Sequence, residues 1–223
     1  MVQKDYIFRF LRDLRNNNSK EWMNENRERY HTMKKRWLEE IELILERFSK
    51  HDDFFAGVNP KKTLSRINNN RRFHPNKPVY KDHITCSPAG RKRYDHSTFF
   101  ISIGPNNSFI GGGIYHPSKE NLDKIRDAID YEGVTLQKIL NTNSFKSFYG
   151  GLNEYEDKLV TSPQGYNSDH KFINLINHKS YTATIELTED QVVSDNFVDL
   201  VEEAYLKFKP LDEFLVKAIS FEN

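Results

Sequence analysis

The segment 19–49 constrains the fold more than any other part of the chain. Its apolar side chains recur at intervals of three, four or their sums, which is the period of one helix face. They are Trp22, Tyr30, Met33, Trp37, Ile41, Ile44, Leu45 and Phe48. Glu, Lys, Arg and Asn occupy the opposite face, and Ser19 is a favourable N-cap. We therefore predict one long amphipathic helix over 19–49 with its apolar stripe on a hydrophobic core.

The remaining patterns place strands in the middle of the chain and helices at both ends. Alternating apolar residues before and after the turn at Pro105 predict a β-hairpin over about 97–115. Helices are expected at 5–15, from Pro117 onward, and near 134–141, 143–149, 168–177, 194–208 and 210–220, the last two separated at Pro210. Short strands are expected at 62–67, 156–160 and 181–187. The order lacks β-α-β alternation, so the fold class is α+β, with an antiparallel strand-rich centre packed with N-terminal and C-terminal helices.

Composition bounds the organisation and the partners of the chain. Its 223 residues suit a single domain over 1–223, with a helical N-terminal segment of about 5–50 and an α+β remainder. The 33 Lys and Arg nearly balance the 32 Asp and Glu, which excludes a uniformly basic nucleic-acid binder but permits local basic patches.

Cysteine, histidine and hydropathy patterns exclude several kinds of site. The single cysteine, Cys86, excludes an intrachain disulfide and a CxxC zinc site, and no histidine pair has metal-ligand spacing. We therefore expect no metal and no cofactor. No run approaches the ~18 apolar residues of a membrane span, and residues 1–20 lack a signal-peptide pattern. A cytoplasmic protein without a membrane partner is the expectation.

The densest group of anion-binding side chains lies between Ser65 and His83, where no acid precedes Asp82. The candidate ligand-binding residues there are Arg66, Arg71, Arg72, Lys77, Tyr80 and Lys81. Prolines pin the segment as a loop, and arginine forks suit phosphate or carboxylate oxygens. Phe73 and Tyr80 offer rings for stacking on a base or sugar. In the alternative interpretation, the arginines pair with acids of the 19–49 helix and Phe73 fills the core.

A second candidate region follows the predicted hairpin. Gly112 and Gly113 permit close approach of a ligand to the backbone, with Tyr115 beside them and Arg126 on the following helix. The alternative is a bulge or tight packing of the glycines under a neighbouring helix. The run 16–18 is a third feature. Its asparagines either satisfy backbone groups of a loop or line the same cleft as the basic residues.

Several motifs in a fixed order resemble one known family. They are Phe10-Leu11-x-x-Leu14-x-x-Asn17-Asn18-x-x-x-Trp22, Arg71-x-Phe73, Lys77-Pro78-x-Tyr80-Lys81, Gly112-Gly113-Ile114-Tyr115-x-Pro117, Leu122-x-x-Ile125-Arg126-x-Ala128-Ile129, Lys158-Leu159 and Pro163-x-Gly165-Tyr166. This order is similar to the family catalogued as domain of unknown function 2461, over about residues 6–219. The resemblance implies a single α+β domain and carries no activity. The pattern of that family implies an Arg-Asp pair in the central loop where this chain has Asn69-Asn70, and a later acid where it has Asn76.

Three functions of different classes remain open from the sequence. The leading hypothesis is a domain that binds an anionic ligand, either a phosphate-bearing small molecule or a nucleic acid. The first alternative is a protein–protein interaction module without a small-molecule site. The second is a hydrolase or nuclease-like enzyme, for which acids such as Glu120, Asp123, Asp127 and Asp169 would have to cluster near the basic residues. The asparagines in the loop disfavour that enzyme, and no catalytic residue is assigned.

Overall fold

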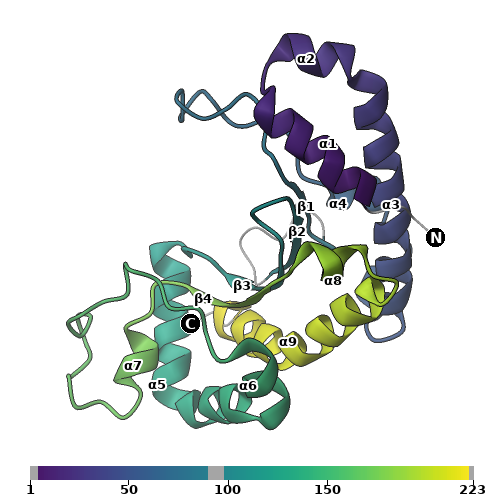
Figure 1. The fold of residues 1–223 in the computed structure, drawn as a ribbon. Coiled ribbons are helices and arrows are strands. Elements are labelled where there is room, and N and C mark those ends of the chain that lie inside the picture. The colour runs from purple at the N-terminus through teal and green to yellow at the C-terminus, as the bar shows by residue number, and fades with distance from the viewer. Residues whose placement is uncertain (1–4, 90–97, 221–223) are drawn as a thin grey trace. The chain divides into compact units, whose positions relative to one another are not determined.

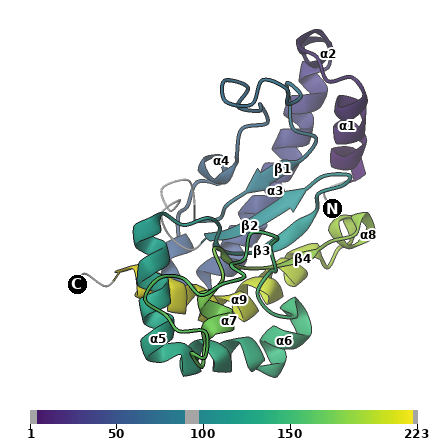
Figure 2. The same ribbon diagram turned by 90° about the vertical axis from the view of Figure 1, so that its left-hand side faces the viewer.

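A computed structural model describes residues 5–89 and 98–220 (Figure 1). The elements in chain order are α1 (Asp5–Asn16), α2 (Lys20–Glu25), α3 (Arg27–Ser49), the 3-10 helix η1 (Asp53–Phe55), α4 (Pro60–Thr63), β1 (Ile84–Cys86), β2 (Thr98–Ile103), β3 (Phe109–Ile114), α5 (Lys119–Asn141), α6 (Asn143–Tyr149), α7 (Ile173–Ile176), β4 (Tyr181–Glu186), α8 (Glu189–Val193) and α9 (Phe197–Ser220). The strands form one antiparallel sheet in the order β1-β2-β3-β4 (Figure 2). The predicted α+β class is confirmed, as is the central hairpin formed by β2 and β3.

The first three helices bury the apolar stripes that the sequence shows. On α1 the residues Ile7, Phe10 and Leu11 are fully buried, and α1 lies along α3 (Figure 1). The Ser19 hydroxyl caps α2 by accepting a hydrogen bond from the Trp22 main-chain N–H at 3.1 Å.

The prediction of one helix over 19–49 is wrong, because the chain breaks between α2 and α3. Asn26 has φ −104° and ψ 21°, outside the helical region. Its side-chain Nδ2 donates to the Trp22 carbonyl at 3.0 Å, and its Oδ1 accepts from Arg29 at 2.9 Å. An asparagine that hydrogen-bonds nearby main-chain groups competes with the helix ladder, and here that competition divides the segment.

The last helix differs from the prediction in the opposite sense, because α9 continues through Pro210. A proline inside a helix removes one hydrogen bond and costs roughly 3 kcal/mol. Phe208, Leu211 and Leu215 around it are fully buried. Burying one such side chain contributes about 1.5–3 kcal/mol, so the packing outweighs the local penalty.

Short elements were predicted less well than long ones. Segment 62–67 is not a strand: it contains the end of α4 and a single bridge from Leu64 to Cys86. Segment 156–160 is a turn, and of 168–177 only α7 is α-helical. Strand β1 was not predicted. The prediction of a strand at 181–187 and of a helix at 143–149 is confirmed by β4 and α6.

The chain divides into two compact units, which we describe separately. Unit 1 comprises residues 1–91, 100–110 and 186–203, and unit 2 comprises 92–99, 111–185 and 204–223. The single domain expected from the sequence stays a prediction.

In unit 1, β1 pairs with β2 so that Cys86 lies opposite Ile101. The Cys86 thiol is buried and donates to the Thr63 hydroxyl at 3.2 Å. Burial raises the pKa of Cys86 to about 12.

Candidate functional site

The candidate cations of unit 1 lie on one loop, residues 66–81, which we call the basic loop. Main-chain hydrogen bonds close its base: the Lys81 N–H donates to the Ile67 carbonyl at 2.8 Å, and the Asn69 N–H to the Val79 carbonyl at 3.1 Å. A β-bridge joins Asn68 and Tyr80 between these two bonds. Beyond this base, residues 70–78 are all exposed and form the tip.

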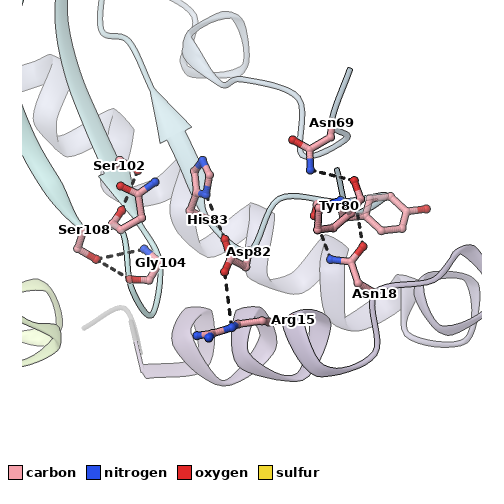
Figure 3. Close-up of polar contacts among 11 residues, drawn as sticks. Arg15, Asn18, Asn69, Tyr80, Asp82, His83, Ser102, Gly104 and Ser108 are labelled. Atoms are coloured by element: carbon pink, nitrogen blue, oxygen red, sulfur yellow. Dashed lines mark hydrogen bonds and ion pairs between the residues drawn. The ribbon is translucent and has the colours of Figure 1, made fainter. Parts of the chain in front are cut away.

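The base of the basic loop is held by Asn18, which lies at the corner between α1 and α2 (Figure 3). The Asn18 Nδ2 donates to the Tyr80 carbonyl, and the Tyr80 N–H donates to the Asn18 Oδ1, both at 2.9 Å. The side-chain amide thus pairs with the main chain in the way that a neighbouring strand would. The interpretation of the asparagine run as a satisfier of loop backbone groups is confirmed. Asn17 instead donates to the Asp13 carbonyl within α1.

Three exposed cations of the basic loop have no ion pair with a described acid. Arg66, Arg72 and Lys77 are exposed, and within residues 5–89 and 98–220 the structure gives them no ion pair. Arg71 is also exposed and donates to the Pro75 carbonyl at 3.2 Å, a bond that shapes the tip. The alternative in which these arginines pair with acids of the long helix therefore has no support among the described residues. Lys81, at the base, is partly buried.

Phe73 does not fill the core, so that part of the alternative is wrong. Its side chain is 70% exposed, and the Arg72 guanidinium lies over its ring at 5.6 Å. Exposing a phenylalanine forfeits about 1.5–3 kcal/mol of burial free energy. The tip therefore carries an aromatic face beside cations that have no ion pair with any residue in 5–89 and 98–220.

One acid lies at the base of the loop rather than at its tip. The Asp82 carboxylate is 3.9 Å from the Arg15 Nε and 3.3 Å from the His83 Nδ1 (Figure 3). The β2–β3 turn lies beside this group, because a Cβ added to Gly104 would be 2.6 Å from the His83 Cβ. No sequence pattern predicts this cluster, since Arg15 belongs to the polar face of α1. Ser108 braces the same turn through hydrogen bonds to both main-chain groups of Gly104.

The three asparagines that depart from the resembled pattern lie at different depths in the loop. Asn69 is partly buried, and its Nδ2 donates to the Pro78 carbonyl at 3.0 Å, across the base (Figure 3). Asn70 and Asn76 are exposed on the tip. An aspartate at position 69 would have no Nδ2 donor for that carbonyl, so this asparagine contributes to the shape of the loop.

The candidate glycines of unit 2 are closely packed. A Cβ added to Gly112 would be 2.5 Å from the Thr98 carbonyl oxygen and 2.8 Å from the Phe208 ring of α9. Gly113 has φ +126°, and its missing side chain leaves room for the backbone of β4. Tight packing, the alternative considered from the sequence, is confirmed for both positions. A role in ligand binding stays a prediction.

The other two candidates of unit 2 differ in exposure. Tyr115 is 61% exposed and meets the rings of His116 and Tyr155 in T-shaped contacts at 4.2 and 5.4 Å. Arg126 is only 8% exposed, and its Nε donates to the Ile176 carbonyl at 3.0 Å. Its guanidinium thus braces the main chain at the C-terminal end of α7. A common cleft for the basic loop and these residues stays a prediction, because the two sets belong to different units.

Two searches over the described ranges bear on other kinds of site. No three His, Cys, Asp or Glu side chains in residues 5–89 and 98–220 come together as a metal-ligand set. Of the helices in the same ranges, none has the length and apolar character that a membrane span requires.

Comparison with protein families agrees with the motifs along the chain. Residues 6–214 match the family model described as "Conserved hypothetical protein (DUF2461)". No curated protein and no solved structure matches the chain. The family match includes α1, the basic loop, the glycine strand β3 and most of α9. Since it covers nearly the full length, the chain belongs to the DUF2461 family.

Proposed function

We propose that the protein binds a phosphate-bearing ligand through the basic loop, and that a nucleic-acid strand is the form of ligand that fits best. The observation that carries the proposal is the tip itself. Its cations Arg72 and Lys77 have no ion pair among the described residues, and neither has Arg66, just before the base; the exposed ring of Phe73 lies next to Arg72. In a chain whose net charge is near zero, clustered like charges repel one another without stabilising the fold. Such a tip therefore favours an anionic partner.

The positive charge of this part of the sequence extends beyond the tip. No acid occurs between Asp53 and Asp82, whereas Lys61 and Lys62 on α4 are exposed and add to the cations of the loop. Arginine and lysine recognise phosphate through charge-assisted hydrogen bonds, which are stronger than neutral ones. An exposed loop with several such groups suits a chain of phosphates better than a single enclosed one.

The aromatic ring distinguishes a nucleic acid from a simple polyphosphate. Phe73 offers a face on which an unpaired base can stack, worth roughly 1–3 kcal/mol per base. The neighbouring guanidinium of Arg72 also stacks on planar rings. Single strands expose base faces, whereas duplexes do not, so a single strand is the preferred form of the ligand.

The test is fluorescence anisotropy with a labelled single-stranded oligonucleotide at several salt concentrations. Three or four phosphate contacts predict that log affinity falls with log salt with a slope of about −2 to −3. The variant Arg72→Ala/Lys77→Ala should bind more weakly and reduce the magnitude of the slope by about 1.4, because it removes two contacts of about 0.7 each. Both side chains are exposed, so the melting temperature should not change.

The matched control is Lys35→Ala/Lys119→Ala, which removes the same charge from side chains that are 80% and 93% exposed on α3 and α5. It should bind like the wild type. Phe73→Ala should weaken binding to the oligonucleotide but leave binding of inorganic polyphosphate unchanged. The proposal fails if the wild type binds neither polyanion at low salt, or if the loop variant binds as tightly as the control.

A further inference from the structure

Unit 2 contains a cavity between α5 and the C-terminal part of α9, which is the yellow end of the chain in Figure 2. Its volume is about 260 Å³, a little below the roughly 300–1,000 Å³ of sites for drug-sized ligands. Two alanines and Phe214 contribute its apolar surface, and Tyr131, Asp127 and Lys217 are among the other lining residues. None of them belongs to the basic loop.

The aromatic residues of the cavity differ sharply in exposure. Phe214 is 6% exposed and belongs to the core, whereas Tyr131 is 89% exposed. The Tyr131 ring therefore has almost no protein atoms over it and can gain by covering a ligand. A body of hydrocarbon or aromatic character can lie against these two rings, where its burial contributes about 25 cal/mol per Å².

The two lysines that line the cavity are both paired with glutamates, whereas Asp127 is not paired with a described cation. The Lys217 ammonium lies 2.8 and 2.9 Å from the two carboxylate oxygens of Glu132, and Lys124 pairs with Glu120 at 3.1 Å. Each lysine is thus already neutralised. Asp127 accepts a hydrogen bond from the Tyr166 hydroxyl at 2.9 Å but has no cationic partner among the described residues.

The electrostatic potential near Asp127 is therefore negative. The pKa of Tyr166 is raised, first by burial and then by its hydrogen bond to Asp127 and by the charges of Asp127 and Asp130. The nearby Arg126 acts in the opposite sense but does not reverse the shift. A cation entering this cavity meets a carboxylate that has no cationic partner among the described residues, whereas an anion is repelled.

The cavity is also preformed. Helix α5 is interrupted at Glu132, with φ −117° and ψ 22°, beside the cavity. The next residue, Gly133, packs so closely on Phe172 that a Cβ would lie 2.4 Å from the nearest atom of its ring. The two bonds from Lys217 to Glu132 join α9 to α5 at the same level. The packing of Gly133 on Phe172 and the ion pair between Lys217 and Glu132 thus stabilise the interrupted form of α5. Ligand binding therefore needs little change in the shape of the cavity.

We propose that this cavity binds a small organic amine. Its ammonium group lies beside the Asp127 carboxylate, and its apolar body rests against Phe214 and under the exposed ring of Tyr131. An ammonium near a tyrosine face gains further from the ring quadrupole. This site shares no residue with the basic loop, and its ligand has the opposite charge.

The experiment is isothermal titration calorimetry on the whole protein with 2-phenylethylamine as the probe. The anion 3-phenylpropionate has a similar body and the opposite charge, and ammonium chloride has the charge without the body. The amine should bind in preference to both. Asp127→Asn should weaken amine binding two- to fivefold, which is the size of a partly exposed ion pair. Tyr131→Ala should weaken it by a similar factor.

The matched control is Asp123→Asn, one turn earlier on α5, where the carboxylate already pairs with Lys119 at 3.2 Å. It should leave amine affinity unchanged. Asp127 is exposed and Asp123 is partly exposed, so circular dichroism should show folded protein for each variant. The proposal is overturned if the carboxylate probe binds as tightly as the amine, if the amine gives no heat, or if Asp127→Asn and Asp123→Asn behave alike.

Discussion

Replacing Asn18 with alanine tests how the basic loop is held. The change removes the two 2.9 Å hydrogen bonds between the Asn18 side chain and the main chain of Tyr80. A typical bond contributes about 0.5–1.5 kcal/mol net, so the free energy of unfolding should fall by about 1–3 kcal/mol. At roughly 3 °C per kcal/mol for a chain of this length, a loss of 2 kcal/mol lowers the melting temperature by about 6 °C.

The assay is urea denaturation combined with amide hydrogen exchange. Asn17→Ala is the control, because among the described residues the Asn17 side chain makes one exposed hydrogen bond, to the Asp13 carbonyl, and its loss should cost below about 0.5 kcal/mol. In Asn18→Ala the amides of Tyr80 and Lys81 should exchange faster than in the control. Equal stabilities of the two variants, together with unchanged exchange at Tyr80, would show that the loop does not depend on this clamp.

Three further predictions concern unit 2. Gly113→Ala should prevent native folding, because the added Cβ would overlap the backbone of β4; Gly150→Ala, also at positive φ but with open space around it, should lower the urea-unfolding free energy by only about 1–2 kcal/mol. Tyr149→Phe should lower it by about 1–3 kcal/mol, because a buried carbonyl of α9 loses its 2.7 Å bond to the phenol. Burial, and next the charge of Lys158, lowers the pKa of His178 below 6.5. The unfolded chain therefore takes up this proton first, and stability that is present above pH 6.5 is lost as the pH falls toward the folded-state pKa. Urea unfolding on both sides of pH 6.5 should show this loss in the wild type and a smaller one in His178→Asn; identical pH profiles would refute the assignment.

Local patterns were sufficient to predict an element where apolar residues repeat with one regular period along it. The hairpin of β2 and β3 follows from apolar alternation with a turn, and α1 follows from its helical period. The same reasoning failed at Asn26 and Pro210, where a single side chain or its packing decides between a break and continuity. At Asn26 a side-chain hydrogen bond overrides the apolar period, and at Pro210 the buried neighbours override the residue's own preference.

The candidate site shows a similar division. The charge of the basic loop is readable from composition, and so is its irregular backbone, because prolines exclude a helix. Its shape is not readable, because it depends on the pairing of Asn18 with Tyr80 across many intervening residues. The exposure of Phe73 could not be inferred either, since an aromatic residue is a core residue by default and only the fold shows where its ring points.

The seclusion of Cys86 has a practical consequence for work on this protein. The thiolate is the reactive form of cysteine, and a buried thiol with a pKa of about 12 has very little of it at neutral pH. Maleimide reagents should therefore leave the native chain unmodified. A cysteine introduced on the exposed tip, for instance by Asn76→Cys, would then accept a fluorophore at one defined position. The natural Cys86 would not have to be removed. Such a label would report ligand arrival directly from the loop.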